Sequence, residues 1–171
     1  MNKTLAAVTV TVFATFAAAP PAAAEGEAGA FSKGRTHFVA SGGTGNAFGE
    51  SYLVVGLGVH HYLSDGFSVG LSVESWAGSD PGLTKVTPSV QYVFYRNQRL
   101  KPYIGGFYRR TYIEDLPDID SVGGRGGVYF SAGRNAYVGV GAVYENYIDC
   151  RNSVYRSCSD TYLEVSFTIS F

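Results

Sequence analysis

The sequence predicts an all-β protein, an eight-stranded antiparallel up-and-down β-barrel that crosses a membrane. Three observations lead to this fold class. Eight segments alternate apolar and polar residues with a period of two, as strands with one apolar and one polar face do. The connections between these segments alternate between long and short. The chain also begins like an exported protein, and no later apolar run is long enough for a membrane-spanning helix.

Residues 1–24 have the composition of a cleaved secretory signal peptide. One lysine precedes an uncharged apolar run over residues 5–19, and small residues lead to Ala24, after which we expect cleavage. A retained anchor helix is the alternative, although the run is short for a bilayer span. Residues 25–33 are expected to form a short, loosely ordered leader, and residues 34–171 the barrel domain.

The composition fits a closed barrel and excludes some classes of partner. The formal net charge is -1 and the basic residues are scattered, so no basic patch predicts nucleic-acid binding. The 22 glycines let a tight sheet bend, and the 13 tyrosines and 11 phenylalanines suit the interfacial girdles of a membrane barrel. Strands can cross a membrane only as a closed barrel, because lipid satisfies no backbone polar group.

The expected strands follow one another in order along the mature chain. The third is typical: Phe67, Val69, Leu71 and Val73 alternate with Ser, Gly, Ser and Glu. The fifth is too ambiguous to show whether Arg109 or Arg110 faces inward. The eight segments are residues 35–41, 52–63, 67–75, 86–95, 102–113, 122–131, 137–147 and 163–171.

The connections test this assignment independently. If both termini are periplasmic, the first, third, fifth and seventh connections should be the longer, external loops. These cover residues 42–51, 76–85, 114–121 and 148–161, whereas the three others are shorter and contain turn-forming residues. A soluble eight-stranded barrel or sandwich remains the alternative, since it would show similar strands.

The chain resembles the small OmpA/OmpX-type outer-membrane β-barrels over nearly its whole mature length. The resemblance rests on the signal peptide, the eight strands, the Pro102-Tyr103-Ile104-Gly105-Gly106 motif, the Gly123-Gly124-Arg125-Gly126-Gly127 motif and the terminal aromatic residue. The last strand is similar to the C-terminal assembly signal of such barrels, formed by Leu163, Val165, Phe167, Ile169 and Phe171.

This resemblance implies a location and partners. We expect the protein in the outer membrane of a Gram-negative bacterium, with both termini periplasmic and with outer-membrane lipid and lipopolysaccharide around it. The C-terminal strand would engage the barrel-assembly machinery. External loops would be available to a protein or host ligand. We expect a monomer with no cofactor and no metal.

Two cysteines, Cys150 and Cys158, lie in the last expected external loop. An exported chain passes through an oxidising compartment, so we expect them to form a disulfide. Closing so short a loop stabilises a protein by roughly 2–3 kcal/mol in the chain-entropy model. A metal pair or a reactive thiol is the alternative, although the loop contains no histidine.

Several charged residues fall on the polar face of the expected strands and should point into the barrel. An unpaired buried carboxylate costs several kcal/mol, so we expect an interior ion-pair network. It would be either a static polar core or a gate that rearranges to pass small ions. Its expected members are Arg35, Glu74, Arg125, Glu145 and Glu164, with one of Arg109 and Arg110, waters and the tyrosines Tyr52, Tyr62, Tyr129 and Tyr162.

The sequence carries no pattern of an enzyme. Some outer-membrane barrels modify lipid A, but no His-x-Ser arrangement like that of the deacylases is present, and His60 and His61 fall near the expected periplasmic rim. His37 lies in the first strand. We therefore expect a structural or surface-interaction role, such as envelope integrity, loop display or adhesion. The alternative is a narrow porin-like channel for ions or small hydrophobic solutes.

Overall fold

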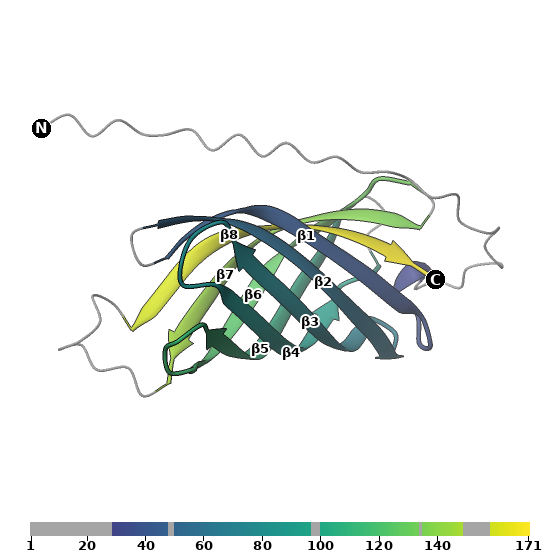
Figure 1. The fold of residues 1–171 in the computed structure, drawn as a ribbon. Coiled ribbons are helices and arrows are strands. Elements are labelled where there is room, and N and C mark those ends of the chain that lie inside the picture. The colour runs from purple at the N-terminus through teal and green to yellow at the C-terminus, as the bar shows by residue number, and fades with distance from the viewer. Residues whose placement is uncertain (1–28, 48–49, 97–99, 134, 149–157) are drawn as a thin grey trace, which may run out of the picture.

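The computed structural model describes residues 29–47, 50–96, 100–133, 135–148 and 158–171. A 3₁₀ turn, η1 (Gly29–Phe31), precedes eight strands that form a closed barrel (Figure 1). Each strand pairs antiparallel with the next, and the last pairs with the first, which confirms the predicted fold class. The strands are β1 (Thr36–Ala47), β2 (Glu50–Ser64), β3 (Phe67–Ala77), β4 (Leu83–Val93), β5 (Leu100–Ile113), β6 (Ile119–Ser131), β7 (Ala136–Tyr147) and β8 (Ser159–Ser170).

The observed strands are mostly longer than the alternation predicted. The expected loop over residues 42–51 is largely strand, because β1 continues to Ala47 and pairs there with Glu50 of β2. Residues 42–47 are small or polar and therefore carry no hydrophobic period, yet their backbone pairs with β2. The expected loop over residues 76–85 is shorter for the same reason, since β4 begins at Leu83 rather than at residue 86.

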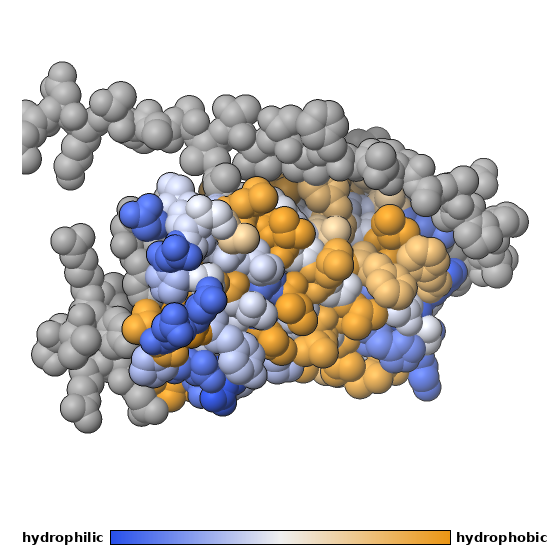
Figure 2. Space-filling model, in the orientation of Figure 1, coloured by the Kyte–Doolittle hydropathy of each residue, from blue (hydrophilic) through white to orange (hydrophobic). Residues whose placement is uncertain are grey.

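The outer surface of the barrel is apolar. Figure 2 shows hydrophobic residues gathered across the middle of the visible face, with hydrophilic residues toward both ends. The five apolar residues predicted on one face of the last strand all point outward, and the Phe171 ring meets the Phe38 ring edge-on at 5.5 Å. A sheet with this outer face is suited to lipid, because nearly all of its strand backbone is paired on both sides, apart from parts of β1 and β8. Among the described residues, no helix is long and apolar enough to cross a membrane.

One end of the barrel is closed by buried aromatic residues, which we call the aromatic plug. Its centre is Phe31, which is 0% exposed and lies 4.9 Å from the Tyr137 ring and 5.8 Å from the Tyr62 ring. The Phe31 carbonyl accepts a hydrogen bond from the backbone N–H of Gly66, at the turn between β2 and β3. The plug consists of Ala30, Phe31, Tyr62, Val93, Tyr103, Tyr129 and Tyr137.

The plug corrects one expectation from the sequence. Residues 25–33 were expected to be loosely ordered, but residues 29–31 form η1 and insert Phe31 into the barrel end. Burying a phenylalanine ring stabilises a protein by several kcal/mol, which exceeds the entropy lost by ordering three residues only if the ring packs well. Here it does, because four rings surround it, counting that of His37.

The barrel is closed by a short ladder between β1 and β8, which we call the seam. The ladder between β1 and β2 runs from the pair Thr36–His61 to the pair Ala47–Glu50. The ladder between β1 and β8 begins at His37–Ser170 and ends at Ala40–Phe167. Beyond this point each of the two strands keeps only its other neighbour.

Replacing Phe31 by alanine should destabilise the folded barrel. The substitution removes a fully buried ring, which typically costs about 3–5 kcal/mol, whereas Phe130→Ala removes a ring from the outer face. The temperature at which the fast-migrating folded band on a gel converts to the unfolded band measures the difference. Equal conversion temperatures for the two variants would show that the plug contributes nothing to stability.

Candidate functional site

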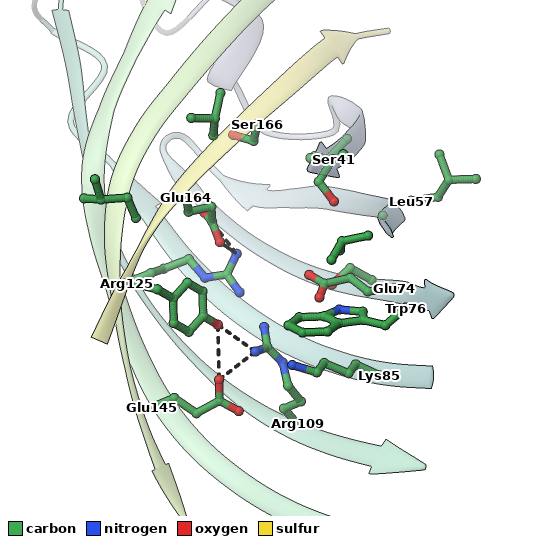
Figure 3. A pocket seen from close by; sticks show the side chains of 18 of the residues that line it. Ser41, Leu57, Glu74, Trp76, Lys85, Arg109, Arg125, Glu145, Glu164 and Ser166 are labelled. Carbon is green, nitrogen blue, oxygen red and sulfur yellow. Dashed lines mark hydrogen bonds and ion pairs between the residues drawn. The ribbon is translucent and has the colours of Figure 1, made fainter. Parts of the chain in front are cut away.

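Between the plug and the opposite end of the barrel lies a cavity of about 500 Å³. Charged side chains from β3 to β8 point into it (Figure 3). An eight-stranded barrel is only wide enough for side chains and a small space, so the cavity is what these residues leave unfilled.

The most buried charged pair in the cavity is Arg109 of β5 and Glu145 of β7. Their Nη1 and Oε2 atoms are 2.7 Å apart, and both residues are 2% exposed. Arg109 also donates from Nη1 to the Tyr162 hydroxyl at 2.7 Å and from Nε to Thr87 Oγ1 at 3.0 Å. Ser121 donates to the second carboxylate oxygen of Glu145 at 2.5 Å. The pair is therefore held by several polar neighbours, as a stable buried ion pair requires.

The structure shows which of Arg109 and Arg110 faces the barrel interior, a point that the sequence left open. Arg109 shares the inward parity of Phe107, whereas Arg110 points outward and pairs with Asp118 at 3.0 Å. Arg110 is half-exposed, so its ion pair is a surface contact of small energetic value.

A second ion pair joins β6 and β8. Arg125 Nη1 lies 3.2 Å from Glu164 Oε2, and both side chains are mostly buried. Arg125 stands within the run of glycines of β6, and its guanidinium lies 5.0 Å from the Phe107 ring centroid. Its Nε finds no hydrogen-bond partner among the described residues.

Glu74 and Lys85 lie opposite each other in the β3–β4 ladder and line the same cavity. The Lys85 ammonium lies 3.9 Å from the centre of the Trp76 ring, a cation–π contact. Within the described part of the chain, Glu74 has no ion pair closer than 4.0 Å and no hydrogen bond. The Trp76 indole N–H is buried and likewise unmatched there.

The structure places the remaining predicted residues at different points. Arg35 precedes β1 and belongs to neither interior ion pair. Tyr162 lies beside Arg109, and Tyr129 accepts a hydrogen bond from Gln91, whereas Tyr52 packs with Leu83 and Ile113 at the end opposite the plug. Cys150 lies outside the described residues, so its disulfide with Cys158 stays a prediction.

The three histidines lie in three different environments. His37 is buried beside the plug, where its Nε2 atom hydrogen-bonds the Ala30 carbonyl at 2.8 Å. His60 lines the cavity, and its Nδ1 atom has no partner among the described residues. His61 is exposed and hydrogen-bonds Thr36. Among the described residues, no serine hydroxyl hydrogen-bonds a histidine nitrogen: Ser170, the ladder partner of His37, donates to the Ala30 carbonyl instead.

Sequence reasoning missed Trp76 and Lys85 because both fell in a segment expected to be a loop. The alternation of Leu83, Lys85 and Thr87 continues that of the fourth strand and could have placed Lys85 inward. It could not have placed Trp76 next to Lys85, because that contact depends on the register of two strands.

Comparison with known proteins agrees with this geometry. No protein-family model and no curated protein matches the sequence. The N-terminal β-barrel domain of Pseudomonas aeruginosa OprF is similar in structure, with a TM-score of 0.61 and 12% identity over 81% of this chain and 98% of that domain. Neisserial surface protein A has a TM-score of 0.50 and 14% identity, over 80% of this chain and 93% of that protein.

The chain has the fold of the small outer-membrane β-barrels. This confirms the resemblance inferred from the eight strands and the terminal aromatic residue. At identities this low, the similarity defines the architecture of the barrel and leaves its role to be argued from its own residues.

Breaking the Arg109–Glu145 pair from one side should destabilise the barrel strongly. Arg109→Gln leaves the Glu145 carboxylate buried without its cation, which typically costs about 3–5 kcal/mol. Urea unfolding in detergent micelles measures the loss. Arg110→Gln is the neighbouring control and should change little, because that side chain is exposed. An Arg109 variant as stable as the Arg110 variant would contradict the assigned role of the pair.

Proposed function

We propose that this protein is an integral outer-membrane barrel with a structural and surface-interaction role, without catalytic activity and without a continuous pore. The apolar outer surface and the fold shared with outer-membrane barrels support the location. Outer-membrane lipid and lipopolysaccharide would surround it. External loops, including the one that carries Cys150, would present residues to a protein or host ligand. Both termini would lie in the periplasm, at the plug end of the barrel.

The observation that carries this proposal is the aromatic plug. Phe31 and Val93 are 0% exposed, so the barrel interior is filled where an ion would have to leave it. Interior packing without voids of this kind stabilises a protein and excludes water. The polar network then acts as a core that satisfies its own charges.

The placement of the histidines supports the absence of catalysis. His37, the histidine of the first strand, is buried against Phe31 and Tyr62 and cannot meet a substrate without opening the plug. A nucleophile or general base must come within hydrogen-bond reach of the reacting group. Incubation with the purified protein should therefore leave the mass of lipopolysaccharide unchanged.

A second candidate function is a narrow channel in which the interior network is the gate. The cavity of about 500 Å³ beside Arg109 and Glu145 favours it, because a small change of rotamer would enlarge that space. The plug argues against it, since the cavity alone does not connect the two ends of the barrel.

Planar-bilayer conductance should distinguish the two functions. We expect no discrete current steps from the native protein and none from Glu145→Gln, because the plug stays closed in both. Phe31→Ala should allow small openings, since it removes the ring at the centre of the plug. Current steps in the native protein that grow in Glu145→Gln would show a gated channel and contradict the proposal.

We further propose that the barrel-assembly machinery recognises the last strand. The Phe171 ring is half-exposed on the outer face and its backbone pairs with Thr36, so its truncation removes little buried surface. Phe171→Ala should therefore slow insertion in cells several-fold while leaving the unfolding midpoint of the isolated barrel almost unchanged. Pulse-chase appearance of the folded band measures insertion. Phe130→Ala is the control. If Phe171→Ala inserted as fast as this control, the result would argue against an assembly signal at the C-terminus.

A further inference from the structure

The end of the barrel opposite the plug is strongly acidic, although the net charge of the whole chain is only -1. The described cations nearest to this end are Arg110, on the outer face, and Lys85, which points into the cavity. The carboxylates lie on the connections and strand ends of all four hairpins that meet there. We call them the acidic crown, which consists of Glu50, Asp80, Glu114, Asp115, Asp118, Asp120 and Asp160.

Most of the acidic crown has no cation beside it. Arg110 lies 3.0 Å from Asp118 and 3.9 Å from Asp120. The other five carboxylates have no lysine, arginine or histidine nitrogen within 4.0 Å in the described part of the chain. Uncompensated charges of one sign produce a potential that attracts the opposite sign and speeds the encounter with an oppositely charged partner.

The rest of the molecule does not share this imbalance. In the cavity, Glu145 and Glu164 are paired with arginines, and Glu74 faces Lys85 across the β3–β4 ladder. The plug end has an excess of cations, since Asp65 is its single acidic side chain among the described residues. The cations at that end are Lys33, Arg35, Arg96 and Lys101. The negative charge is therefore a property of one end of the barrel.

A groove of about 530 Å³ lies within the acidic crown, between the β3–β4 loop and the end of β5. Asp80 and Glu114 are its charged residues, and no described cation lines it. Its walls also contain Leu83, Ile113 and the half-exposed ring of Tyr112. This volume is within the range of about 300–1,000 Å³ that is typical of ligand sites. The groove thus combines an apolar surface with carboxylates.

The loop holds Glu114 at the groove. The Glu114 backbone N–H donates to the Gly82 carbonyl at 3.0 Å, and a side-chain carbon at position 82 would lie 3.0 Å from Glu114 Oε2. Asp80 belongs to the same loop, and both carboxylates are exposed. A long cationic side chain matches this arrangement, because its aliphatic stem can cover apolar surface while its head pairs with a carboxylate.

Other occupants fit the acidic crown less well. The phosphate groups of lipid carry the same sign of charge and are repelled. Among the described residues, no three carboxylate, histidine or cysteine side chains converge as they would at a protein metal site. A cationic group on a protein meets neither objection, since it brings the opposite charge and needs only one or two carboxylates.

We propose that the acidic crown is a docking surface for a basic segment of another protein, with an arginine or lysine side chain in the groove beside Asp80 and Glu114. The inference rests on the proposed function, which places this end of the barrel outside the cell. It adds the chemistry of the external partner.

A labelled tetra-arginine peptide tests the proposal. The intact mature protein is folded into nanodiscs of phosphatidylcholine, a lipid without net charge, and the fluorescence anisotropy of the peptide is measured as protein is added. We expect saturable binding that weakens as salt is added. The same peptide with citrulline in place of arginine should bind about tenfold more weakly, because its head group is neutral.

Two neighbouring variants separate the groove from the general field. Glu114→Gln and Asp115→Asn each remove one exposed negative charge, but only Glu114 lines the groove. Asp115 has a φ of 60°, a conformation that asparagine tolerates. We expect Glu114→Gln to weaken binding of the arginine peptide about tenfold and Asp115→Asn about twofold. Asp80→Asn should behave like Glu114→Gln.

Three results would overturn the proposal. Equal affinity for the arginine and citrulline peptides would show that charge is not recognised. Equal effects of Glu114→Gln and Asp115→Asn would show that the groove takes no part. Saturable calcium binding that displaces the peptide would make the acidic crown a metal site instead. Heat-modifiable migration shows beforehand that each variant is folded, and if Glu114→Gln does not fold, Asp80→Asn and the peptide pair decide.

A labelling experiment tests the orientation separately. Asp115→Cys should react with a membrane-impermeant maleimide on intact cells, with the native chain as the blank. Labelling without peptide binding in nanodiscs rejects the docking surface alone. Peptide binding without labelling contradicts the proposed orientation, and with it an external partner.

Discussion

Closure of an eight-stranded sheet is the constraint on which the rest of this structure depends. Each strand pairs with two neighbours, and only β1 beyond Ala40 and β8 before Phe167 lack one of them, so most backbone groups of the wall are satisfied without water. Eight strands give an interior that is just wide enough for side chains. The interior must therefore be filled, and every charge placed there must find a partner. The Arg109–Glu145 and Arg125–Glu164 pairs, and the aromatic plug, are consequences of that narrow interior.

The alternation of residue types was enough to predict the fold and the facing of many side chains. Glu74, Glu145 and Glu164 were expected to face inward because their strands have clear apolar faces, and all three line the cavity. Strand β5 has apolar or aromatic residues at both parities, so Arg109 and Arg110 could not be told apart. Pairing across the barrel decided that question, through contacts with residues 36 and 53 positions away.

Two features had no signal in the periodicity. Phe31 lies in a short segment rich in small residues, and only the burial of its ring against four others shows that it belongs to the core. The contact of Lys85 with Trp76 depends on the register between β3 and β4, which alternation alone does not define. Tertiary packing, rather than local propensity, determines both.

The seam between β1 and β8 is short, and the composition of β1 next to it does not favour a longer ladder. Residues 42–47 contain three glycines, a threonine, an asparagine and an alanine, so β1 offers β8 no large apolar side chains there. Cross-strand side-chain pairs supply much of the stability of a sheet, and without them a ladder is easily lost. The ladder with β8 ends next to this run of small residues, although the same run stays paired with β2, and Leu163 on β8 is left exposed.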